Sequence, residues 1–145
     1  MRNIRGLERL ERFLFCTGLF MGASEIWKQW TLTFVLGGGH YNWWYFPFQL
    51  CSVPMYLLLL FPVFHASHVK RIFCTFLMDI GLLSGIGAFL DTSGMHYPLP
   101  FLTCHSYLWH ILLITIGIIC GFSGISDYTW RAVSYTHLRA HETKA

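Results

Sequence analysis

FPFQLCSVPMYLLLLFPVF, residues 46 to 64, is the stretch on which the fold depends, because a helix needs about 20 mostly apolar residues to span a bilayer. The stretch also holds an amide, a thiol and a hydroxyl, at Gln49, Cys51 and Ser52. Pro54 follows them, and a proline inside a helix removes a backbone donor and crowds the preceding turn. The pattern predicts a spanning helix kinked at Pro54, with the polar side chains around the kink.

The rest of the chain is also suited to lipid. Aromatic residues make up 18% of its 145 residues and charged residues 12%, whereas a soluble domain is about 25% charged. Three further stretches are long and apolar, namely residues 13 to 34, 71 to 90 and 101 to 122. The sequence therefore predicts an all-α fold, a polytopic transmembrane helix bundle with four spans, in one domain over residues 1 to 132.

Basic residues gather on one side of this predicted bundle if the four spans alternate in direction. They are Arg2, Arg5, Arg9, Arg12, Lys70, Arg71 and Arg131. The loops on the other side, residues 37 to 45 and 91 to 100, contain no lysine or arginine, and only Lys28 lies near that side. Because cytoplasmic loops carry an excess of basic residues, we expect a multi-pass protein of the cell membrane with its N-terminus in the cytoplasm.

The last residues of the chain, VSYTHLRAHETKA (133 to 145), change abruptly from aliphatic to polar. From Ser134 to Thr143 they resemble the translated adapter sequence that ends many reading frames from fragmentary assemblies. We expect this tail to be non-native and exclude it from the fold. We also expect the native protein to continue past Val133 with further spans.

Charge and cysteine spacing disfavour several classes of function. The net charge of +3 comes from basic residues scattered at helix ends, which predicts membrane lipids rather than nucleic acid as partners. The five cysteines form no C-x-x-C or zinc-binding spacing, so we expect no metal and no cofactor. A haem or metal held by the two histidines of the last span, with help from His40 or His96, is a weaker alternative.

One pair of residue types can carry out chemistry, namely Cys51 with a histidine of the last span. A cysteine and a histidine within hydrogen-bond reach are the minimum for nucleophilic acyl transfer. The candidates are His105 and His110, whose side chains point about 140° apart on a straight helix, so only one is expected to face Cys51. Glu25 in the first span lies at about the depth of His110 and is a candidate to orient it.

Other interpretations of these residues stay open. Cys51 and Cys104 lie near the same face and are candidates for a disulfide, and Glu25 and Lys28 are spaced to form an ion pair. Asp79, in the middle of the third span, is either neutral, paired to another helix, or part of a polar path, because charges there usually face a bundle interior or water. With Glu25 and the histidines it suggests a transporter or lipid-binding protein with a polar path. A purely structural interpretation leaves the cluster as a kink with packing partners.

The stretches WWYFPFQLCS (43 to 52) and HSYLWHILLITIGI (105 to 118) resemble the YwaF-like family of bacterial integral membrane proteins. The likeness extends over residues 7 to 132. It implies a relation to a eukaryotic transmembrane cysteine acyltransferase that remodels ether phospholipids, and a more remote one to androgen-induced membrane hydrolases. By this resemblance Cys51 is the nucleophile, His110 its partner and His105 the reserve. Many relatives have histidine where this chain has Gln49.

Overall fold

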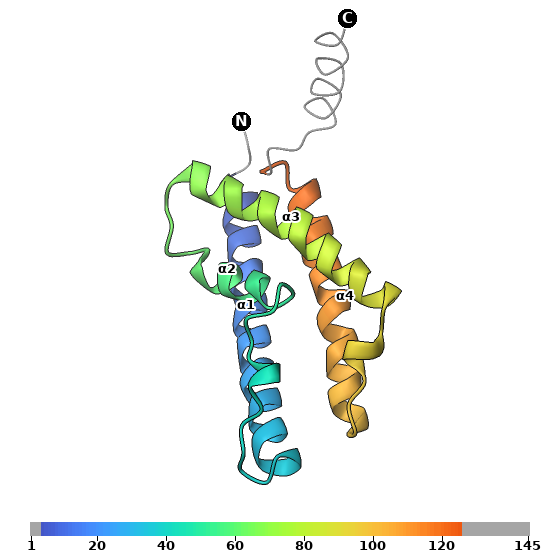
Figure 1. The fold of residues 1–145 in the computed structure, drawn as a ribbon. Helices are drawn as coiled ribbons and strands as arrows, with labels where there is room; N and C mark the ends of the chain where they lie inside the picture. The colour runs from blue at the N-terminus through green and yellow to red at the C-terminus, as the bar shows by residue number, and fades with distance from the viewer. Residues whose placement is uncertain (1–3, 126–145) are drawn as a thin grey trace, which may run out of the picture.

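The computed structural model describes residues 4 to 125, except for the side chains of residues 4, 5 and 7, and shows an all-α chain (Figure 1). Its four α-helices are α1 (Ile4–Trp30), α2 (Val53–Leu60), α3 (Ser67–Leu90) and α4 (Pro100–Phe122). Short helical turns are η1 (Thr31–Leu36), η2 (Trp43–Tyr45) and η3 (Ser93–Met95). The predicted all-α class with four helices is confirmed. The predicted non-native tail, 133 to 145, lies outside the described residues.

Two of the predicted spans appear as long apolar helices. α3 and α4 contain 24 and 23 residues, and within the described part of the chain they are the two helices whose length and composition would allow them to cross a membrane. The predicted first span, residues 13 to 34, lies in α1 up to Trp30 and then in η1, and α1 begins earlier than predicted, at Ile4. The chain leaves η1 through Gly38 and Gly39, whose φ values of +56° and +90° suit glycine.

The predicted kinked helix over residues 46 to 64 is wrong. The helical part, α2, has only 8 residues and is too short to cross a bilayer. Pro54 lies in the first turn of α2, where a missing N–H costs nothing because the first four N–H groups of a helix have no intrahelical partner. Pro62 follows the C-cap residue Phe61 and does not continue the helix. The prolines therefore bound a short helix instead of bending a long one.

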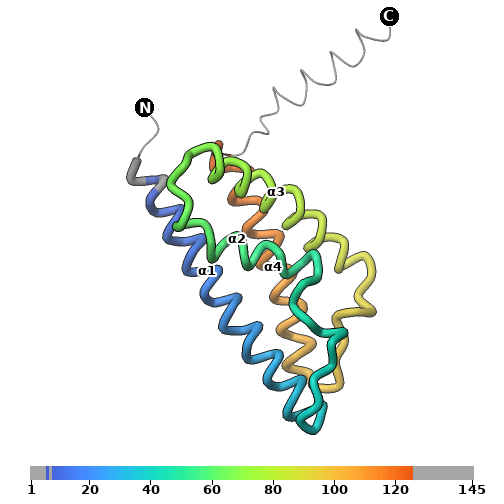
Figure 2. Tube along the Cα trace, turned by 60° about the vertical axis from the view of Figure 1, so that its left-hand side comes forward, coloured from blue at the N-terminus to red at the C-terminus, as the bar shows by residue number. Residues whose placement is uncertain are grey.

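The helices form a bundle in which α3 crosses α4 closely and α1 packs mainly on α2 (Figure 1). A Cβ atom added to Gly85 would lie 3.0 Å from the backbone oxygen of His110, and one added to Gly81 would lie 3.2 Å from that of Leu113. These glycines let the two backbones approach. After η1 the chain runs back beside the last turns of α1 (Figure 2), and the start of α1 and the end of α4 lie at the same end of the bundle.

The close approach of α3 and α4 predicts a difference between two glycines of the same helix. Gly85→Ala should destabilise the protein by about 1 to 3 kcal/mol, because the new methyl group overpacks the contact with α4. Gly87→Ala is the matched control, since a Cβ there meets no atom within 4 Å and alanine favours a helix. Denaturant unfolding in detergent measures both. Equal free energies of unfolding for the two variants would contradict the prediction.

Candidate active site

Residues 46 to 52 are not helical. Nearby backbone N–H groups pair with some of their carbonyls, and side chains of three helices supply donors to others and to the residue before the stretch. Gln29 Nε2 donates to Tyr45 O at 2.6 Å, and the Tyr56 hydroxyl donates to Pro47 O at 2.8 Å. Trp109 Nε1 donates to the carbonyl of Cys51 at 3.1 Å. In an apolar environment an unpaired carbonyl costs several kcal/mol. These bonds therefore fix the path of the chain on both sides of the thiol.

A cavity of about 170 Å³ lies beside this segment and brings the predicted site residues together. Cys51, His105 and His110 all line it. Its walls come from α1, from the segment before α2, from the end of α3 with the following loop, and from α4. Four parts of the chain that are distant in sequence thus enclose one small space around the thiol and both imidazoles.

His110 is oriented by its own helix. Its side chain is buried, and its Nδ1 lies 2.8 Å from the backbone oxygen of Ser106. A carbonyl only accepts hydrogen bonds, so Nδ1 carries the proton in this contact and Nε2 of the neutral ring is left as an acceptor. An imidazole in this tautomer is prepared to take a proton at Nε2.

Glu25 does not have the role that the sequence suggested, because its oxygens contact other residues. Lys28 Nζ lies 2.7 Å from one carboxylate oxygen, and Gln29 Nε2 donates to the other at 2.7 Å. The predicted pair of Glu25 and Lys28 is confirmed, whereas the predicted orientation of His110 by Glu25 is wrong. Lys28 also lies 5.8 Å from the centre of the Trp109 ring, so the ion pair forms part of the wall next to the cavity.

His105 lies on the α1 side of the cavity. Its ring is 5.9 Å from that of Trp27 and 5.6 Å from that of Trp109, measured between centroids. Both ring nitrogens are buried and have no hydrogen-bond partner among the described residues. Both histidines line the cavity together with Cys51. Which of the two imidazoles faces the thiol stays a prediction.

The Cys51 thiol is close to Gln49, with Sγ 3.8 Å from the amide oxygen Oε1. Within residues 4 to 125 no hydrogen bond joins Cys51 to either histidine. Cys51 and Cys104 are both free thiols, so the alternative of a disulfide between them is not formed. The cavity therefore holds a free thiol that must leave its contact with Gln49 to reach an imidazole.

Among the residues of the cavity wall that the sequence reasoning missed are Asp91, Tyr97 and Trp109. Burial raises the pKa of Tyr97 to about 12, with smaller effects of Tyr45, Glu25 and Cys51, so this hydroxyl stays protonated at neutral pH. Hydrogen bonds from Ser93 hold the pKa of Asp91 below its usual value. Trp109 follows His105 by four residues, a helical spacing that places it on the same side of α4. No comparable signal marked Asp91 or Tyr97.

Asp79 does not belong to this site. It is exposed on α3 and lines a separate groove that shares no lining residue with the cavity of Cys51. The option that it pairs with another helix is not realised among residues 4 to 125. A single polar path through Glu25, Asp79 and the histidines is therefore not formed by the described residues.

Comparisons with known protein families, with curated proteins and with solved structures find no match for this chain. The resemblance to the YwaF-like family stays a prediction.

The bond from Trp109 to the carbonyl of Cys51 predicts that this indole holds the site together. Trp109→Phe should lower the free energy of unfolding by about 1 to 3 kcal/mol, because it leaves a partly buried carbonyl without its donor. The same variant should speed alkylation of Cys51 relative to the exposed Cys104. Trp44→Phe is the control, since Trp44 is 78% exposed. If both variants unfold and react like the wild type, Trp109 does not anchor the segment.

Proposed function

We propose that this chain is an integral membrane protein that transfers or hydrolyses acyl groups of membrane lipids, with Cys51 as the nucleophile and His110 as the base. The observation that supports this most is the shared cavity, which a thiol and two imidazoles line from different parts of the chain. A nucleophile next to a base is the minimum for covalent acyl chemistry. The resemblance of residues 43 to 52 and 105 to 118 to the YwaF-like family implies the same pair.

The membrane part of the proposal starts from α3 and α4, whose length and apolar composition allow a crossing. The basic residues before and within the start of α1, together with Lys70 and Arg71 at the start of α3, favour a cytoplasmic location for that end of the bundle. The cavity is lined from the opposite side of the bundle, by the end of α3, the following loop and the first turns of α4. We therefore assign the site to the outer leaflet.

The proposed reaction begins with a proton transfer from the Cys51 thiol to Nε2 of His110. The thiolate attacks the carbonyl carbon of a lipid ester, the ester C–O bond breaks, and the departing alcohol takes the proton from His110. The acyl group is then held on the sulfur as a thioester. Water or a second lipid alcohol, deprotonated by the same nitrogen, attacks this thioester, and the sulfur leaves and regains a proton.

Cys51 precedes Ser52, the N-cap residue of α2, and so lies next to the first turn of that helix. Burial raises the pKa of the Cys51 thiol above its usual value, and Lys28 and a hydrogen bond with Ser52 oppose this rise only in part. The thiol is therefore protonated at neutral pH, and the proposed chemistry needs a base such as His110 to remove its proton.

A neighbouring apolar groove supports lipid as the substrate class. The groove has a volume of about 310 Å³, lies between α1 and α4, and is lined by residues such as Phe20, Leu108 and Leu112. His105 and Trp109 line both the groove and the polar cavity. An acyl chain in the groove would place its ester near the two imidazoles. The orphan nitrogens of His105 are at this boundary and offer hydrogen bonds to the ester or the departing alcohol.

The transporter interpretation has less support, because it needs Asp79 on the same path as Glu25 and the histidines. Asp79 instead lies on the outer face of α3. The two proposals differ in their response to substitution. A transporter would tolerate loss of the Cys51 thiol, which the acyl chemistry does not.

The proposed thioester predicts a covalent adduct at Cys51. After incubation with a phospholipid that carries a fluorescent acyl chain, the wild type should be labelled, and hydroxylamine should release the label because thioesters are labile to it. Cys51→Ala should abolish the labelling. Cys104→Ser, which removes another free and more exposed thiol, is the matched control and should be labelled normally. Label that persists in Cys51→Ala would rule out this nucleophile.

The geometry of the two histidines predicts different roles for them. His110→Gln should slow thioester formation by about 10²- to 10⁴-fold, the usual contribution of a general base. His105→Gln should slow it by much less, because its nitrogens are proposed to bind the ester. The rate of His110→Gln should recover as pH rises, since hydroxide then deprotonates the thiol. A rate that stays low at all pH values would assign His110 a structural role.

A further inference from the structure

Asp79 is the charged residue that neither the cavity nor the proposed chemistry uses. It lies 12 residues after Ser67 and 11 before Leu90, which at about 1.5 Å per residue puts it roughly 16 to 18 Å from either end of α3. A carboxylate with so short a side chain cannot reach an interface from there. Its side chain is exposed, and among residues 4 to 125 it has no hydrogen-bond or ion-pair partner.

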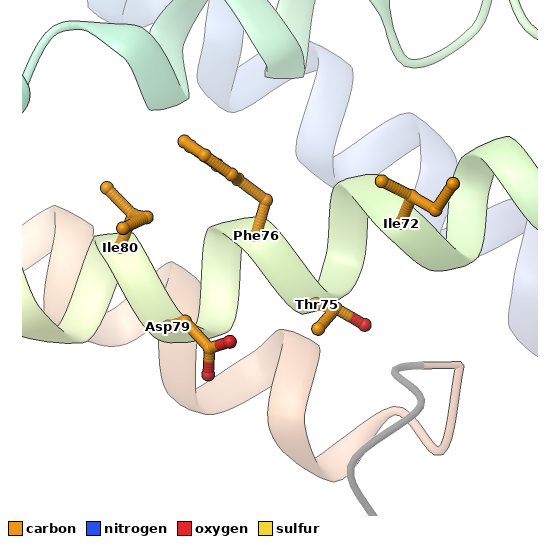
Figure 3. Close-up of a pocket in the computed structure, with 5 residues that line it drawn as sticks. All are labelled: Ile72, Thr75, Phe76, Asp79 and Ile80. Carbon is orange, nitrogen blue, oxygen red and sulfur yellow. The ribbon is translucent and has the colours of Figure 1, made fainter.

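The surface around Asp79 is a shallow, open groove along one helix, α3. Two rows of side chains at four-residue spacing border a space of about 310 Å³. One row is Ile72, Phe76 and Ile80, and the other is Thr75 and Asp79 (Figure 3). Figure 3 shows the carboxylate projecting away from the aromatic ring of Phe76. Rows of this spacing form the ridges between which a second helix packs its own side chains.

We propose that this groove on α3 binds a membrane helix that carries a basic side chain near its midpoint. Charged residues at mid-depth of spanning helices are rare and are usually paired with another residue or directed to water. Lipid chains offer no donor for the carboxylate, whereas a lysine or arginine on a neighbouring helix supplies both a donor and the opposite charge. The lysines of the described chain do not reach it, because Lys28 pairs with Glu25 and Lys70 with Glu11.

A second copy of this chain fits the groove less well. In a symmetric dimer the same patch faces itself, so a contact centred on Asp79 would bring two carboxylates together. Like charges at such a contact repel, and no basic residue of the groove relieves them. The charge of the patch therefore favours a helix of different sequence. The inference needs α3 to lie in a membrane but does not depend on the proposed acyl chemistry.

Fluorescence energy transfer in vesicles of phosphatidylcholine and phosphatidylglycerol tests this inference. The full chain carries a donor at its N-terminus, and the probe is a 21-residue leucine-alanine helix with an acceptor and one central lysine. A probe with leucine at that position is its control. The wild type should bind the lysine probe at least about tenfold more tightly than the leucine probe. Asp79→Leu and Asp79→Asn should both lose this preference, and Asp79→Glu should keep it.

A variant that carries the carboxylate on another helix tests whether the preference for lysine needs the groove or only a negative charge. Ile111 is the central residue of α4 and is 49% exposed, so Asp79→Leu combined with Ile111→Asp moves the carboxylate to another face at similar depth. This double variant should not recover the preference for lysine. Recovery of the preference would overturn the inference. Equal binding of the two probes by the wild type would also overturn it, and would indicate that lipid chains cover the groove. Energy transfer between two labelled copies that depends on Asp79 would also overturn it in favour of self-association.

Discussion

The structure depends on how the non-helical residues before α2 satisfy their backbone carbonyls. A chain that leaves helical geometry loses its regular backbone hydrogen bonds, and the carbonyls that turns do not pair need other donors. Gln29, Tyr56 and Trp109 supply them from α1, α2 and α4. The same bonds hold the helices around the segment, so the polar residues inside an apolar stretch are explained by a loop that is tied to three helices. The thiol of this loop then faces the space between them.

A second constraint is the contact of α3 with α4, which the glycines of α3 make possible. At Gly85 the neighbouring backbone oxygen belongs to His110, so the helix crossing fixes the position of the imidazole-bearing turn. Gly117 of α4 makes the reciprocal approach to Leu82. Because packed backbones leave no space for adjustment, the α3 side of the cavity is rigid. The α1 side of the cavity is packed less closely, since α1 contacts α4 little and the apolar groove lies between these two helices.

The sequence predicted the parts of this fold that depend on helix length and periodicity. The α3 and α4 helices follow from long apolar runs, and the pair of Glu25 and Lys28 follows from a spacing of three residues. It failed at residues 46 to 52, because an apolar run has the same composition whether it is one long helix or a loop followed by a short one. Pro54 suits a first turn as well as a kink, and only the donors on distant helices decide between these. The roles of Asp91 and Tyr97 depend on such distant contacts too.

Glu25 of α1 and Asp79 of α3 are two carboxylates in opposite environments. Glu25 is buried near the end of α1, where it contacts Lys28 and Gln29 of its own helix. A carboxylate at the centre of a membrane helix costs about 2.5 to 3.5 kcal/mol on insertion scales, and Asp79 is the one at the middle of α3. Asp79 has the same chemistry without such partners, on the face of α3 that points away from the bundle. The described residues thus pair one carboxylate within the bundle and leave the other exposed on α3. The proposed acyl chemistry and the proposed helix contact therefore use different faces of the described bundle.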